Sequence, residues 1–112
     1  MVGNEMNTED IAMDDRFSKD SLVYLYRGIL SLQTVEECAD FFEDLCTPSE
    51  LFEMSRRLQA ADMLKAGYIY SEIALQTGLS TATISRVNRC LKYGSEGYLT
   101  VLDRLERERR RG

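Results

Sequence analysis

The 112-residue chain contains no histidine. Without imidazole it lacks the most common general base and the usual partner of a catalytic serine or cysteine. Its three cysteines, Cys38, Cys46 and Cys90, have no CxxC spacing and are odd in number, and most zinc sites also need histidine. We therefore predict no catalytic residues and no metal site, and we interpret the cysteines as reduced residues that pack on helix faces.

Long apolar runs are also missing from the chain. No stretch approaches the run of about 18 apolar residues that a membrane helix needs. Residues 1–14 are acidic and lack the basic and apolar regions of a signal peptide. We therefore expect a cytoplasmic protein with no membrane partner. Its single domain is predicted over residues 15–108, after a disordered lead-in at 1–14 and before a frayed tail at 109–112.

Basic residues are scarce in the first half of the chain. Residues 1–54 hold 3 basic and 13 acidic groups, residues 55–94 hold 6 and 2, and residues 95–112 hold 5 and 4. The local net charges of −10, +4 and +1 sum to the overall −5. The basic cluster at 55–94 can attract phosphate at close range although the whole chain is acidic. A solvated charged face is the other interpretation of this cluster.

Proline occurs only once, and no period-two alternation of apolar residues persists along the chain. The pattern predicts an all-α fold with about six helices, the first starting near residue 18. Two helices begin with capping boxes, in which a threonine precedes a glutamate by three residues: Thr34 with Glu37, and Thr47 with Glu50.

The first two predicted helices are apolar over more than one face. Their apolar residues are Leu22, Leu25, Ile29 and Leu32, a second stripe of Val23, Tyr26 and Leu30, and then Val35, Cys38, Phe42 and Leu45 on the side expected to be buried. A small bundle cannot cover all of this surface, and large exposed apolar patches mark interfaces. We infer a dimer in which the N-terminal helices of two chains pack together.

Residues 70–89 satisfy the steric requirements of a helix-turn-helix. Ala74 is small enough for close approach of the second helix, and Gly78 can supply the positive φ of the turn four residues later. Ser80 can cap the second helix with its hydroxyl group. The inward-facing apolar positions are Ile73, either Leu75 or Leu79, Ile84 and Val87.

Small polar residues are concentrated at the start of the second helix, which would enter the major groove of DNA by this end. The predicted DNA-binding residues are Tyr70, Ser71, Ser80, Thr81, Ala82, Thr83, Ser85, Arg86 and Arg89. The small side chains would let the backbone approach base edges, directly or through water. Arg86 and Arg89 would reach phosphates or a guanine, while Tyr70 and Ser71 would contact the DNA backbone.

The segments "LCTPSELFEMSRRLQAADMLKAG" and "YSEIALQTGLSTATISRVNRCLKYG" resemble the Trp repressor superfamily, and within it the TrpR-like YerC/YecD branch. The resemblance covers roughly residues 20–105. It implies an intertwined, all-helical homodimer that represses transcription at a palindromic operator. It also implies a pocket for a small effector, in which Arg57 and Arg86 match the two arginines that enclose tryptophan in the Trp repressor, and Thr47 is matched as well.

Two residues of this implied pocket depart from the Trp repressor pattern. Val87 stands where the repressor has glycine, and Cys90 stands where it has a serine that meets the amino group of the ligand. Val87 would occupy space that an indole needs, and a thiol is a poor hydrogen-bond partner for an ammonium group. We therefore do not expect tryptophan as co-repressor or any bound cofactor, and the identity of another effector stays open.

The acidic N-terminal half supports an alternative function, because it would be repelled by DNA. In that case the protein would be an interaction adaptor that keeps the fold without binding DNA.

Overall fold

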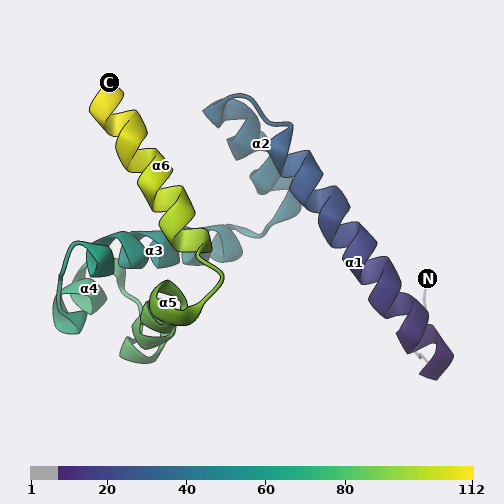
Figure 1. The fold of residues 1–112 in the computed structure, drawn as a ribbon, viewed down its shortest axis with the longest axis horizontal. Coiled ribbons are helices and arrows are strands. Elements are labelled where there is room, and N and C mark those ends of the chain that lie inside the picture. Colours follow the sequence, from purple (N-terminus) through teal and green to yellow (C-terminus); the bar gives the residue numbers. More distant parts are fainter. Residues whose placement is uncertain (1–7) are drawn as a thin grey trace. The chain divides into compact units, whose positions relative to one another are not determined.

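The computed structural model describes residues 8–112, with side chains from residue 18 onwards. Its six helices are α1 (Thr8–Leu30), α2 (Val35–Leu45), α3 (Pro48–Lys65), α4 (Tyr70–Thr77), α5 (Thr81–Tyr93) and α6 (Gly97–Arg111), and the described residues contain no strand (Figure 1). The all-α prediction is therefore confirmed. The chain divides into two compact units, residues 1–45 with α1 and α2, and residues 46–112 with α3 to α6.

Helices extend into both segments that were predicted to be irregular. Helix α1 begins at Thr8, within the predicted lead-in at 1–14, of which residues 1–7 lie outside the described residues. No proline or glycine interrupts residues 8–27, and acidic residues in the first turn favour the positive end of the helix dipole. The predicted frayed tail is likewise helical over 109–111, where arginines occupy the last turn of α6.

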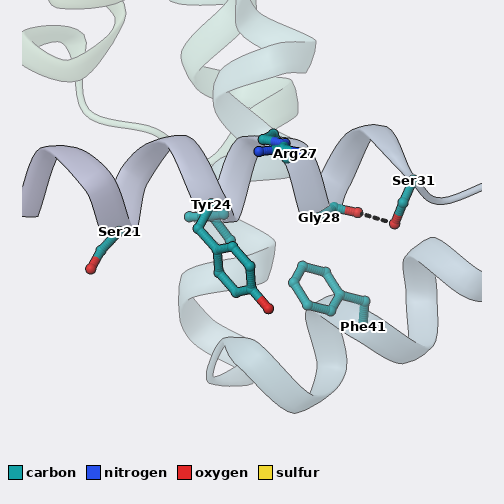
Figure 2. A pocket seen from close by; sticks show the side chains of 7 residues that line it. Ser21, Tyr24, Arg27, Gly28, Ser31 and Phe41 are labelled. Carbon is teal, nitrogen blue, oxygen red and sulfur yellow. Dashed lines mark hydrogen bonds between the residues drawn. The ribbon is translucent and has the colours of Figure 1, made fainter.

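The unit formed by α1 and α2 leaves much apolar surface exposed. The side expected to be buried in α2 contains no buried residue, and Val35 is 79% exposed. Cys38 is also exposed, so within the single chain it does not have the packing role predicted for it. An open groove of about 580 Å³ runs between the two helices, with Tyr24 and Phe41 lining it (Figure 2). Among the residues of this unit whose side chains are described, Leu30, Val35 and Leu45 are at least half exposed.

The second unit is built around α3, which packs against α4, α5 and α6 (Figure 1). Ala60 and Ala61 on α3 are completely buried, so the neighbouring helices approach its backbone closely. One core cluster joins Ala60 and Met63 of α3 to Ile73, Leu79 and Ile84 of the α4–α5 region. A second cluster joins Ala61, Val87 and Leu102, and it links α3 to α5 and α6.

Local signals fix both ends of α3. The predicted capping box is present: the Glu50 N–H donates to Thr47 Oγ1 at 3.2 Å, and the Thr47 N–H donates to Glu50 Oε1 at 2.8 Å. The bond from the Thr47 backbone, and then a further one that the Thr47 hydroxyl donates to Glu50 Oε1 at 3.1 Å, lower the pKa of Glu50. At the other end Gly67 has a φ of 96°, and the N–H groups of Gly67 and Tyr68 donate to the carbonyls of Leu64 and Met63. This pair of bonds is the Schellman ending of a helix.

The described helices include none that is long and apolar enough to cross a membrane.

The cysteines are free thiols, as expected, but Cys90 is exposed and Cys46 only half-buried. Their expected packing role is therefore wrong for Cys90, because its side of α5 faces solvent.

Candidate nucleic-acid interface

The turn between α4 and α5 has the geometry that the sequence predicted. Gly78 ends α4 in the left-handed region, with φ 75° and ψ 5°, and its N–H donates to the Ala74 carbonyl at 2.9 Å. A side chain at this φ would be strained, so glycine suits the position.

Thr77 is a second structural residue of the turn, which sequence reasoning missed. Thr77 is buried, with only 5% of its surface exposed. The Thr77 Oγ1 donates to the Ile73 carbonyl at 2.7 Å and accepts from the Leu79 N–H at 3.2 Å. The only signal in the sequence was a hydroxyl residue directly before the turn glycine, a position where such side chains often bond the local backbone.

The apolar positions of the helix-turn-helix are buried as predicted, with one choice now settled. Ile73 and Ile84 are completely buried, and Leu79 and Val87 are 6% and 3% exposed. Leu75 is 85% exposed, so Leu79 is the inward-facing residue of the two alternatives. Ala74 is partly buried against the first core cluster, as its small size led us to expect. The α4–α5 pair is therefore held rigidly on α3.

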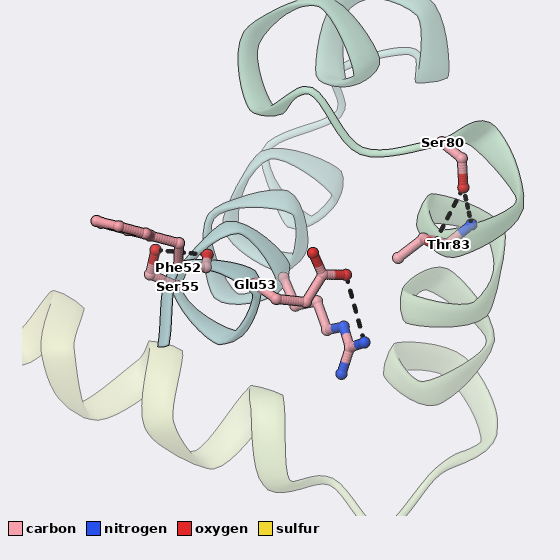
Figure 3. A network of polar contacts seen from close by, with 6 residues as sticks. Phe52, Glu53, Ser55, Ser80 and Thr83 are labelled. Carbon is pink, nitrogen blue, oxygen red and sulfur yellow. Dashed lines mark hydrogen bonds and ion pairs between the residues drawn. The ribbon is translucent and has the colours of Figure 1, made fainter. Parts of the chain in front are cut away.

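The start of α5 presents small polar side chains to solvent. Ser80 caps the helix: its Oγ accepts from the Thr83 N–H at 3.1 Å and donates to Thr83 Oγ1 at 3.0 Å (Figure 3). Ser80, Thr81 and Ala82 are exposed, while Thr83 and Ser85 are half-buried. The first turn of α5 is thus an exposed edge with little side-chain bulk and with N–H groups near its surface.

The remaining predicted DNA contacts differ in exposure. Arg86 and Arg89 are exposed further along α5, and Ser71 is exposed in the first turn of α4. Tyr70 is only half-buried because its ring packs against the first core cluster. At the start of α4 the Glu72 carboxylate accepts from the Ile69 N–H at 3.2 Å.

Four of the five residues of the implied effector pocket lie near Tyr98, which sequence reasoning had not included. Burial of the phenol raises the pKa of Tyr98, the nearby Cys90 raises it further, and the positive charges of Arg57 and Arg86 oppose this. Tyr98 and Val87 belong to the second core cluster, with Val87 buried. The interior between α3, α5 and α6 is therefore filled by valine and tyrosine side chains at this place.

Thr47 and Arg57 lie apart within one chain. Thr47 caps α3, and ten residues of helix place Arg57 about 15 Å further along the axis. Arg57 forms an ion pair with Glu53 one turn earlier, at 3.3 Å, and both side chains are substantially exposed.

Comparisons with known proteins agree with this geometry. The family described as Trp repressor protein matches residues 20–106. The YerC protein of Bacillus subtilis (strain 168) is 48% identical over 92 residues, which are 82% of this chain and 88% of YerC. Its name is that of the branch that the sequence motifs indicated.

Two solved structures are also similar. A TrpR-like protein from Eubacterium eligens ATCC 27750 has a TM-score of 0.77 and 46% identity, over 82% of this chain and 95% of that one. A candidate Trp repressor from Staphylococcus aureus has a TM-score of 0.75 and 48% identity, over 78% of this chain and 87% of that one.

Proposed function

Because the chain belongs to the Trp repressor family, we propose that it is a cytoplasmic, homodimeric repressor that reads a palindromic operator through α4 and α5. Members of this family are transcription regulators that bind DNA, and they are not enzymes. The expectation that this chain is not an enzyme is thereby confirmed. The repressive action, the dimer and the operator are the proposal.

The observation that carries the proposal is the exposed, sterically light first turn of α5. Ser80, Thr81 and Ala82 are exposed there, on a helix whose opposite side is locked by the buried Ile84 and Val87. Such an edge can enter the major groove until backbone and hydroxyl groups meet base edges, with water filling the remaining gaps. Arg86 and Arg89 then supply the phosphate contacts that position the helix.

The apolar surface of α1 and α2 supports the homodimer. Leu30 and Val35 are 82% and 79% exposed, and several neighbouring large apolar residues are also exposed. Exposed apolar patches of this extent mark interfaces. Small side chains make weak individual base contacts. A dimer that places one α5 on each of two half-sites would therefore bind more tightly than a single protomer.

We further propose that this repressor needs no tryptophan. Val87 is 3% exposed, and Tyr98 and Leu102 pack in the same cluster. These side chains would hold α5 against α3 and α6 without a ligand. Isothermal titration with tryptophan should therefore detect no binding at micromolar concentrations, and saturable micromolar binding would overturn this part of the proposal.

The experiment for the DNA-binding function is a selection. The full-length protein would be mixed with sheared genomic fragments at about 150 mM salt, where screening is physiological, and the bound fragments would be sequenced. We expect enrichment of a short palindrome. A Thr83→Leu variant selected in parallel should enrich nothing. If the unaltered protein also enriches nothing, the operator proposal fails and an adaptor function becomes the better explanation.

A further inference from the structure

Helix α6 carries a basic face that its packing does not use. Five of the eight residues 104–111 are arginine. Arg104, Arg107 and Arg111 recur at the spacing i, i+3, i+7, so they share one face of the helix, which we call the arginine face. All three are exposed, whereas Leu102, on the side that packs against α3 and α5, is buried.

The arginine face keeps an excess of positive charge, although Asp103 attracts Arg107 and Glu108 lies one helical turn after Arg104. Asp103 is paired with Lys65 at 2.6 Å, and Glu106 is paired with Arg110 at 3.0 Å. No ion pair among the described residues includes Arg104, Arg107 or Arg111. Attraction to the helix dipole explains arginines in the last turn, but the dipole effect does not reach as far back as Arg104 and Arg107.

Helix α2 carries the complementary pattern. Its carboxylates are Glu36, Glu37, Asp40, Glu43 and Asp44. Glu36, Asp40 and Glu43 recur at i, i+4, i+7 and form what we call the acidic face of α2. All of these residues are exposed, and no ion pair among the described residues includes them. The two faces therefore match in length, spacing and opposite charge.

We propose that the arginine face of α6 binds the acidic face of α2 from a second copy of this chain. Residues 1–45 hold 11 acidic and 3 basic groups, a net charge of −8, and residues 46–112 hold 8 and 11, a net charge of +3. Across two copies, unlike units attract and like units repel. This charge distribution favours α2 of another copy of the chain as the acidic partner.

Arginine and a symmetric pair of copies both strengthen this contact. The guanidinium group binds carboxylate through two parallel hydrogen bonds, which the ammonium group of lysine cannot do. A two-fold symmetric pair forms the contact twice, so exposed ion pairs that are weak individually act together. The inference rests on the self-association in the proposed function, but it does not require DNA binding.

The test uses two full-length variants with reversed charges. The first carries Glu36→Lys, Asp40→Lys and Glu43→Lys, and the second carries Arg104→Glu, Arg107→Glu and Arg111→Glu. Either variant alone brings like charges together, but a mixture restores both contacts. The matched control replaces the same three arginines with lysine. Sedimentation velocity without DNA would measure self-association at about 50 mM and about 500 mM salt, since screening is strong only at the higher concentration.

We expect either triple variant to self-associate at least about tenfold more weakly than the unaltered chain at low salt, as several exposed ion pairs together allow. The equimolar mixture should recover to near the unaltered level. The lysine control keeps the charge but not the paired hydrogen bonds, so it should fall only slightly below that level. High salt should remove the differences between the charge-reversed variants and the unaltered chain. Circular dichroism would establish that each variant is folded.

Each of the following results would overturn the inference. If either variant self-associates like the unaltered chain, or the mixture does not recover, α2 and α6 do not pair. If the arginine variant loses DNA affinity while its assembly is unchanged, the arginines contact phosphate instead. An unaltered chain that is monomeric throughout would overturn this pairing and the proposed homodimer together, whereas a salt-insensitive dimer would leave the homodimer standing.

Discussion

At the scale of single residues, the turn between α4 and α5 depends most on Gly78. Its φ is 75°, and an added Cβ would meet no atom within 4 Å, so a substitution there is strained rather than crowded. Gly78→Val should cost about 1–3 kcal/mol of the free energy of unfolding, because a β-branched residue is disfavoured at positive φ. Urea denaturation measures the cost.

Gly78→Asn is the matched control for this prediction, since asparagine tolerates the left-handed region better than other residues do. Its loss of stability should be clearly smaller than that of Gly78→Val. Equal losses from the two variants would show that the positive φ is not what the position demands.

Thr83 tests whether the start of α5 enters the groove. It is half-buried, and its backbone N–H is already bonded to the Ser80 side chain, so Thr83→Leu keeps the helix cap. The added bulk should abolish operator binding, measured by fluorescence anisotropy, while the unfolding temperature changes by only a few degrees. Thr83→Ser, which keeps the hydroxyl group, should retain most of the binding. Normal operator binding by Thr83→Leu would show that another surface reads the DNA.

At the scale of secondary-structure elements, α6 is tied to α3 by the pair Lys65–Asp103. The hydrogen bond from Lys65 lowers the pKa of Asp103 below its ordinary value of 3.8, and the bond to Asp103 raises the pKa of Lys65 above 10.5. The stabilisation from Asp103 is present above pH 3.8 and is lost as pH falls through its lowered pKa. The stabilisation from Lys65 is present below pH 10.5 and is lost as pH rises through its raised pKa.

Asp103→Asn should therefore lower the unfolding temperature slightly near neutral pH, and the difference from the unaltered chain should vanish in strong acid. The effect is small because the pair is exposed and solvent screens it. Thermal unfolding followed across pH measures it, and Glu108→Gln on α6, an exposed carboxylate in no ion pair among the described residues, serves as the control. A difference that persists unchanged in strong acid would show that the mutation acts through something other than the ion pair.

How well the sequence predicted each element depends on how local its determinants are. The cap of α3 at Thr47, the turn at Gly78 and the start of α5 at Ser80 follow from residues within a few positions, and all were predicted correctly. The choice between Leu75 and Leu79 needed the packing of α4 on α3, because both are apolar and adjacent to the turn.

The burial of α1 and α2 was predicted less well because its determinants are not local. The apolar pattern of α2 predicts a buried side, but a pattern cannot say which chain covers it, and Val35 is exposed in the single chain. Likewise, Tyr98 joins Arg57, Arg86 and Cys90 only through the packing of three helices, which no sequence spacing encodes. The residues proposed to contact DNA remain predictions.

At the scale of the whole molecule, a chain with a net charge of −5 is proposed to bind a polyanion. This is feasible if binding depends on local contacts, since screening limits repulsion from distant acidic groups to about 8 Å at physiological salt. The salt dependence of binding counts those contacts, because each neutralised phosphate releases counterions.

For about six phosphate contacts in the dimer, the slope of log K against log salt should be near −5. Arg89→Ala removes one cation from each protomer. If Arg89 of each protomer contacts a phosphate, the substitution should make the slope shallower by about 2. Arg109→Ala removes the same charge from α6, outside the arginine face, and should leave the slope unchanged. If the two substitutions changed the salt slope equally, binding would depend on net charge alone. The proposal that α5 positions the protein on DNA would then be wrong.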